Sequence, residues 1–127
     1  MSFHFQFNNQ IKRKPRRVVI LGTSGIIANN LEETLKKRNI NILSIGRSKL
    51  NLKNENADKF LAAKIKKEDV VVFIAAEAPA KNVEMLINNL KICKTVCNSL
   101  EKKKINHLVY ISSDAIYADL KGKISEK

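Results

Sequence analysis

Three small residues, Gly22, Gly25 and Ala28, follow the apolar β-branched run Val18–Leu21 at a three-residue spacing. Gly22 permits a tight turn out of a strand, and Gly25 lets a phosphate approach the main chain. Ala28 is small enough for the following helix to pack closely, and the N-terminus of that helix would attract the anion. The pattern predicts a dinucleotide-binding turn, with a plain strand-turn-helix connection as the alternative.

A second pair of polar residues, Arg47 and Ser48, follows the next apolar run, which ends at Gly46. In a dinucleotide-binding fold this position meets the adenosine ribose, where an acid would bind the 2′-hydroxyl of NAD. The acid is absent, and a guanidinium with a hydroxyl can hold a 2′-phosphate instead. The pair favours NADP, with NAD as the alternative cofactor and an ordinary exposed loop charge as the alternative role for Arg47.

The elements that would position these residues alternate along the chain. Apolar runs predict strands over residues 17–22, 40–46, 50–52, 70–76 and 105–111. Amphipathic segments predict helices over residues 26–38, 55–66 and about 79–104, with Pro79 in the first turn of the last one. The alternation predicts an α/β fold, a Rossmann-like doubly wound parallel sheet of about five strands in the order 3-2-1-4-5.

The longest predicted helix has apolar residues at spacings of three and four. They are Val83, Leu86, Leu90, Cys93, Cys97 and Leu100. This spacing predicts one buried helix face. Core packing is therefore the expected role of the two cysteines, and the lack of a Cys/His cluster disfavours a metal site or a disulfide framework.

The length of 127 residues and the hydrophobic content of 44% suit one domain with a modest core. We expect a basic N-terminal tail over residues 1–16 and a partial, C-terminally incomplete NAD(P)-binding domain over residues 17–127. No run approaches 18 apolar residues, and the tail lacks the apolar region of a signal peptide. We therefore expect no membrane span and a cytoplasmic location.

The formal charge is +12, from 24 Lys and Arg residues against 12 acidic residues. Basic clusters at residues 36–38, 64–67 and 102–104 each close a predicted helix, where the helix dipole favours cations. This placement predicts a solvated basic face and disfavours nucleic acid as a partner, with polyanion binding as a weaker alternative.

Three segments together resemble a known family. They are LGTSGIIA at 21–28, DVVVFIAA at 69–76 and HLVYISSDAIYAD at 107–119. They look like the N-terminal half of the extended short-chain dehydrogenases/reductases, which include nucleotide-sugar epimerases, dehydratases and reductases. The last segment is similar to the family motif S-[ST]-x-x-[VI]-Y-G, with Ala118 in place of its glycine. Ala28 also stands where the family more often has glycine.

The resemblance implies roles for individual residues. For cofactor binding it implies Gly22, Ser24, Gly25, Ile26, Ile27, Ala28, Arg47, Ser48, Ala75, Ala76 and Asn89. It implies that Ser113 is catalytic and hydrogen-bonds the reacting oxygen of a nucleotide-sugar substrate. An ordinary helix-surface residue is the alternative for Asn89, and a strand-end cap is the alternative for Ser113.

The family also uses a Tyr-x-x-x-Lys pair for proton exchange during hydride transfer. Tyr117 and Lys121 have this spacing but lie directly after Ser113, where no helix is predicted. The expected function is the NAD(P)-binding part of a nucleotide-sugar epimerase/dehydratase/reductase-like protein, not catalytically complete by itself. A partner chain or a missing C-terminal half would complete it. The alternative is a noncatalytic dinucleotide-binding or interaction module.

Overall fold

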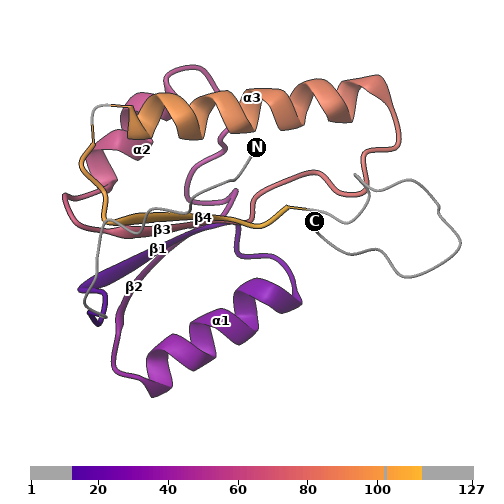
Figure 1. The fold of residues 1–127 in the computed structure, drawn as a ribbon. Helices are drawn as coiled ribbons and strands as arrows, with labels where there is room; N and C mark the ends of the chain where they lie inside the picture. Colours follow the sequence, from indigo (N-terminus) through magenta and orange to yellow (C-terminus); the bar gives the residue numbers. More distant parts are fainter. Residues whose placement is uncertain (1–12, 102, 113–127) are drawn as a thin grey trace, which may run out of the picture.

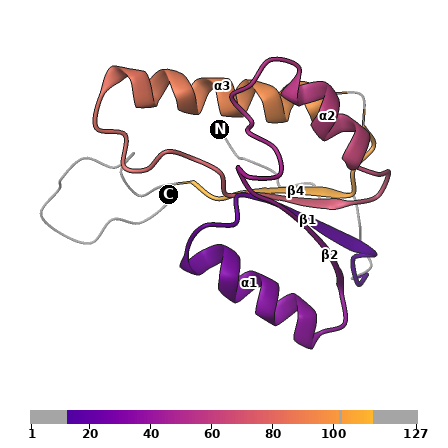
Figure 2. The same ribbon diagram turned by 180° about the vertical axis from the view of Figure 1, so that it is seen from behind.

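The computed structural model describes residues 13–101 and 103–112, which form a parallel β-sheet between two helical layers (Figure 1). The elements are β1 (Arg17–Leu21), α1 (Ile26–Lys37), β2 (Asn41–Ile45), α2 (Ala57–Lys64), β3 (Val70–Phe73), α3 (Val83–Leu100) and β4 (His107–Tyr110). Helix α1 covers one face of the sheet, and α2 and α3 cover the other, as the reverse view also shows (Figure 2). The predicted Rossmann-like α/β class is confirmed.

The sheet order is β2-β1-β3-β4, and all neighbouring strands are parallel. Right-handed crossovers predict this order for these four strands, but the predicted edge strand at residues 50–52 does not form. The carbonyl of Gly46 accepts hydrogen bonds from two N–H groups of the following turn, which redirects the chain after β2. Leu52 enters the core instead, and its carbonyl accepts a hydrogen bond from Thr95 Oγ1 of α3 at 2.8 Å.

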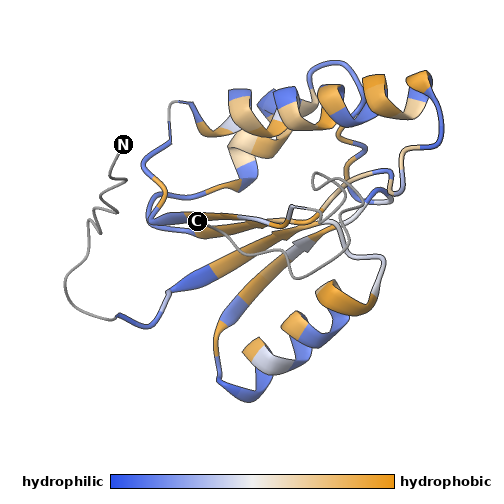
Figure 3. Ribbon diagram, turned by 45° about the vertical axis from the view of Figure 1, so that its right-hand side comes forward, coloured by the Kyte–Doolittle hydropathy of each residue, from blue (hydrophilic) through white to orange (hydrophobic). Residues whose placement is uncertain are grey.

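Strand β1 is apolar on both faces because helices cover both sides of the sheet. Val19 and Leu21 belong to the core cluster that α2 and α3 complete, whereas Val18 and Ile20 pack in the cluster that contains Leu35 of α1. Figure 3 shows this as apolar strands enclosed between the two helical layers. A continuous apolar run was therefore the correct sequence signal for this strand.

An ion pair joins the amino-terminal ends of β1 and β3. The Arg17 guanidinium donates two hydrogen bonds to the carboxylate of Asp69, with Nε at 2.9 Å from Oδ1. The backbone N–H of Lys66 donates to Asp69 Oδ2 at 2.7 Å, and Asp69 is only 3% exposed. The hydrogen bond to Asp69 raises the pKa of Arg17 above its ordinary value because it stabilises the charged guanidinium. These contacts fix the strand ends farthest from the predicted ligand edge.

Apart from Leu100, which packs against the core, helix α3 buries a different face from the one that the sequence predicts. Ile92 and Val96 contact the core, whereas Val83, Leu86 and Leu90 are 71%, 53% and 62% exposed. Both cysteines are exposed and free, so the prediction that they pack in the core is wrong. Apolar residues lie on two sides of this helix, and only one side docks on the sheet. No helix in the described part of the chain is long and apolar enough to cross a membrane.

Two helices begin later than predicted. Helix α2 begins after Asn56, whose backbone has a φ of +58°, instead of near Glu55. Helix α3 begins after Asn82, so Pro79 precedes the helix and does not occupy its first turn. The side chain of Asn82 accepts a hydrogen bond from the N–H of Met85 at 2.9 Å, which caps α3.

Removing this cap with Asn82→Ala is expected to lower the free energy of unfolding by about 1 kcal/mol, because the first turn loses its side-chain acceptor. Urea unfolding followed by circular dichroism measures the change. Asn98→Ala is the matched control, since Asn98 is exposed on the same helix. Its expected change lies within about 0.5 kcal/mol. Equal losses in the two variants would contradict the capping role of Asn82.

The helix-closing lysines lie largely as predicted. Lys36 and Lys37 occupy the last turn of α1, and Lys64 occupies the last turn of α2. Helix α3 has no basic residue in its last turn, so the third cluster follows the helix instead of closing it. The carbonyl of Lys104 accepts a hydrogen bond from the N–H of Glu68 at 2.9 Å. Lys104 therefore lies beside the residues that precede β3.

Candidate functional site

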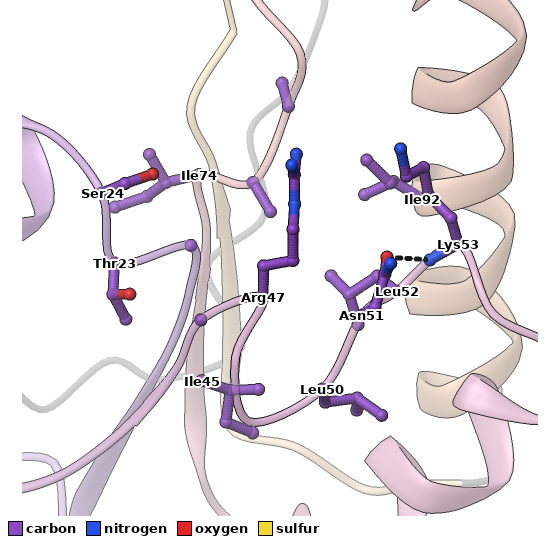
Figure 4. A pocket seen from close by; sticks show the side chains of 14 residues that line it. Thr23, Ser24, Ile45, Arg47, Leu50, Asn51, Leu52, Lys53, Ile74 and Ile92 are labelled. Carbon is purple, nitrogen blue, oxygen red and sulfur yellow. Dashed lines mark hydrogen bonds between the residues drawn. The ribbon is translucent and has the colours of Figure 1, made fainter.

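A pocket opens where β1, β2 and β3 end (Figure 4). Its walls come from residues 22–24, 45–47, 50–53 and 74–76, together with Ile92 of α3. Ligand sites in open parallel sheets lie at this edge, because the loops that leave the strands converge there. The cavity volume of about 100 Å³ is smaller than that of a typical small-molecule site, so a dinucleotide would place only one part inside it.

The turn after β1 needs glycine at two positions for different reasons. Gly22 has a φ of +99°, and a Cβ there would lie 2.7 Å from the backbone nitrogen of Ala75, so no other side chain fits. Gly25 has a φ of +135°, but a Cβ there would meet nothing within 4 Å. The first glycine permits close packing of two backbone segments. The second leaves open space beside the main chain at the start of α1.

Helix α1 begins at Ile26 with features that suit an anion. Its N-cap residue Gly25 makes no side-chain hydrogen bond to the first turn, and that turn carries no acidic residue. The first N–H groups of a helix have no partner within the helix and mark the positive end of its dipole. Ala28 is buried and lets the helix approach the sheet, while Ile26 and Ile27 are exposed beside the turn. This arrangement can hold a diphosphate group.

Arg47 and Ser48 follow β2 as predicted, and a carboxylate that was not anticipated lies near them. Glu77 Oε1 is 2.6 Å from Lys53 Nζ and 3.7 Å from Arg47 Nη2. Asn88 Nδ2 donates to Glu77 Oε2 at 3.1 Å. The hydrogen bond from Lys53 contributes most to lowering the pKa of Glu77, and the hydrogen bond from Asn88 also lowers it. The carboxylate is therefore ionised at neutral pH.

Asn89 holds the backbone of the loop that carries Glu77. Its Oδ1 accepts a hydrogen bond from the N–H of Glu77 at 2.7 Å, and its Nδ2 donates to the carbonyl of Glu77 at 2.9 Å. Asn89 does not line the pocket. The contact with the cofactor that the resemblance implies for Asn89 stays a prediction, and the structure gives this side chain a loop-anchoring contact.

The pocket brings together five of the predicted cofactor-binding residues. They are Gly22, Ser24, Arg47, Ala75 and Ala76. The predicted residues 25–28 continue from it into α1, and Ser48 lies exposed next to Arg47. Their binding roles stay predictions. Ser113, Tyr117 and Lys121 lie outside the described residues.

Sequence reasoning missed two charged residues of the site, Lys53 and Glu77. Lys53 directly follows the strand predicted at residues 50–52, and Glu77 lies in the loop after β3. Charged loop residues carry no periodic signal that would mark them. Within the described ranges, no group of three His, Cys, Asp or Glu side chains is placed to hold a metal ion.

Comparisons with known proteins agree with this fold. The sequence matches the NAD dependent epimerase/dehydratase family over residues 18–127. The fold is similar to that of a GDP-L-fucose synthetase from Naegleria fowleri, with a TM-score of 0.73, 18% identity and coverage of 86% of this chain and 37% of that chain. The NADP-bound structure of that synthetase gives a TM-score of 0.77 at 16% identity, with coverage of 98% and 40%. No curated protein matches the sequence significantly.

Proposed function

The chain belongs to the NAD dependent epimerase/dehydratase family, and from this we propose that residues 17–127 bind NADP in preference to NAD. The observation that carries the proposal is the pocket lined by both Gly22 and Arg47, next to the open side of Gly25 at the start of α1. The fold similarity to an NADP-bound synthetase supports it. The chain spans about two fifths of the length of that synthetase. Any enzymatic activity beyond cofactor binding is therefore part of the proposal.

The residues present fit a dinucleotide in three places. The open side of Gly25 and the uncapped N-terminus of α1 would receive the diphosphate. Arg47 and Ser48 would hold the 2′-phosphate through charge-assisted hydrogen bonds. The small side chains of Ala75 and Ala76 would lie beside the cofactor where it crosses the end of β3. When bound, a nicotinamide cofactor supplies the hydride-transfer chemistry.

The proposed substrate class is a nucleotide sugar, and Ser113 is the proposed donor to its reacting oxygen. General acid–base catalysis is typically worth about 10² to 10⁴ in rate, so an efficient reaction also needs a positioned proton-transfer group. Tyr117 and Lys121 have the spacing of such a pair without a predicted helix to hold them. We therefore propose that another segment or a partner chain supplies this group. The two free cysteines fit a reducing compartment, which supports a cytoplasmic location.

The exposed apolar residues of α3 favour a second candidate, a noncatalytic dinucleotide-binding or interaction module. Val83, Leu86 and Leu90 form one exposed stripe along the helix, and such surfaces are typical of contacts with another protein or segment. Both candidates bind a dinucleotide. Turnover of a nucleotide sugar by the chain together with the segment or partner chain that completes it distinguishes them, since only the first candidate allows it.

Arg47→Ala is expected to weaken NADP binding by about ten- to a hundredfold, because a charge-assisted hydrogen bond contributes about 1.5–3 kcal/mol. NAD has no 2′-phosphate, so its affinity should change much less. Calorimetric titration of both cofactors measures the two affinities. Arg38→Ala is the matched control, since Arg38 is an exposed arginine at the far end of α1. NADP and NAD affinities that are equal in both wild type and Arg47→Ala would overturn the role of Arg47.

A further inference from the structure

One carboxylate oxygen in the site is shared by two cations from different segments. Glu77 Oε1 lies within 4 Å of both Lys53 and Arg47. Arg47 follows β2 and Glu77 follows β3, and β1 lies between these two strands in the sheet. The ion pair therefore spans the end of β1, where Gly22 begins the turn proposed to receive the diphosphate.

The three charged groups differ in how firmly they are held. The side chain of Glu77 is 14% exposed, and Asn88, Asn89 and Lys53 all hydrogen-bond to this residue. The side chain of Arg47 is 70% exposed and reaches Glu77 only at 3.7 Å. Arg47 is therefore the member of the cluster that can leave, while Glu77 stays in place.

The position of Arg47 couples this cluster to the pocket. Figure 4 shows its side chain between Ile74 on one side and Lys53 on the other, within the ring of lining residues. A phosphate that binds the guanidinium there competes with the carboxylate of Glu77 for its positive charge, since the two residues form an ion pair at 3.7 Å. The carboxylate also adds a negative charge close to any anion that enters the site.

We propose that Glu77 is a specificity-determining residue that competes with a ligand's ribose phosphate for Arg47 and thereby limits the preference for NADP over NAD. This inference rests on the proposed function, because it assumes that Arg47 meets the 2′-phosphate. The diphosphate is common to both cofactors, so competition for Arg47 falls mainly on the cofactor with the additional phosphate. Lys53 stays paired with Glu77 and keeps the carboxylate in position.

The test is Glu77→Gln, which removes the charge and keeps a side-chain oxygen that can accept from Lys53 and Asn88. NADP affinity should rise about three- to fivefold, the size of an exposed ion-pair term, while NAD affinity changes less than twofold. Calorimetric titration gives the affinities for NADP and NAD, and the ratio of the two is the NADP:NAD ratio. Glu77→Ala removes the same charge and must move the ratio in the same direction, which guards against a folding defect peculiar to one variant.

Two controls separate competition for Arg47 from general effects. Glu84→Gln makes the same change of net charge at the start of α3, outside the pocket lining, and should leave the ratio unchanged. In an Arg47→Ala background, Glu77→Gln should no longer change the ratio, because the group it competes for is gone. A merely structural role of Glu77 would not depend on Arg47 in this way.

Salt and pH give a further check. The gain in Glu77→Gln should shrink at high salt, which screens the partly exposed pair. It should persist at neutral pH and fade only in acid, as the wild-type carboxylate becomes protonated through its lowered pKa. An unchanged or reduced NADP:NAD ratio in Glu77→Gln, with wild type binding NADP, would overturn the inference alone. Failure of wild type and all variants to bind either cofactor would overturn the proposed function and this inference together.

Discussion

Asp69→Ala is expected to lower the free energy of unfolding by about 3 kcal/mol, the lower end of the cost of breaking a buried ion pair. Asp69 is 3% exposed and accepts hydrogen bonds from Arg17 and from the N–H of Lys66. Among the residues that the structure describes, its removal leaves the Arg17 guanidinium with the carbonyl of Lys64, at 2.9 Å, as its one remaining hydrogen-bond partner. The lower value applies because the Arg17 side chain keeps some contact with water. Urea unfolding followed by circular dichroism measures the loss.

The adjacent carboxylate provides the matched control. Glu68 pairs with Arg16 at 3.4 Å, and both side chains are largely exposed. Glu68→Ala should cost less than about 1 kcal/mol, because water screens such a pair and already solvates its partner. If the two alanine variants lost the same stability, the burial of Asp69 would not be what makes its ion pair important.

Gly25→Val is expected to weaken the binding of NADP and NAD alike by at least about tenfold, or about 1.4 kcal/mol. The space beside Gly25 is open, since a Cβ there meets nothing within 4 Å, and a valine side chain would take the place proposed for the diphosphate. Both cofactors contain that group, which distinguishes this variant from Arg47→Ala. Calorimetric titration of the two cofactors measures the effect.

The effect of backbone strain on binding must be distinguished from the effect of filling the space beside Gly25. Gly25 has a φ of +135°, which a valine adopts only at a cost of about 1–3 kcal/mol. Asn39→Val places the same side chain at another residue with positive φ, at the opposite end of α1. It should also destabilise the fold while leaving both cofactor affinities unchanged. Similar losses of binding in the two variants would show that strain, and not the filled space, explains the Gly25 result.

The sequence by itself determined the parallel sheet and the edge where the site lies. A run such as Val18–Leu21 is apolar at every position because both faces of its strand are covered, and this signal is local. The spacing of Gly22 and Gly25 is equally local, since each backbone conformation belongs to one residue. Once the strands are parallel, their carboxyl ends must share an edge, and Arg47 must follow β2 there.

Only the tertiary structure decided which side of α3 faces the sheet. Its sequence offers one apolar set at Val83, Leu86 and Leu90 and another at Ile92 and Val96, and periodicity alone favoured the first set together with the cysteines. The structure buries the second set, whose side chains join the core cluster that α2 and α3 complete. The core cluster joins residues from distant segments, and a local pattern does not contain those contacts.

The tertiary structure also decided the electrostatics of the site. The missing acid after β2 favoured an anion-binding role for Arg47, yet Glu77 brings a carboxylate to it from the loop after β3. Lys53 reaches the same oxygen because residues 50–52 leave the sheet edge and pack toward α3. Contacts between side chains that are distant in sequence depend on how loops cross the end of the sheet. The sequence gives the identity of each charged residue, but only the folded structure determines which charged side chains lie next to one another.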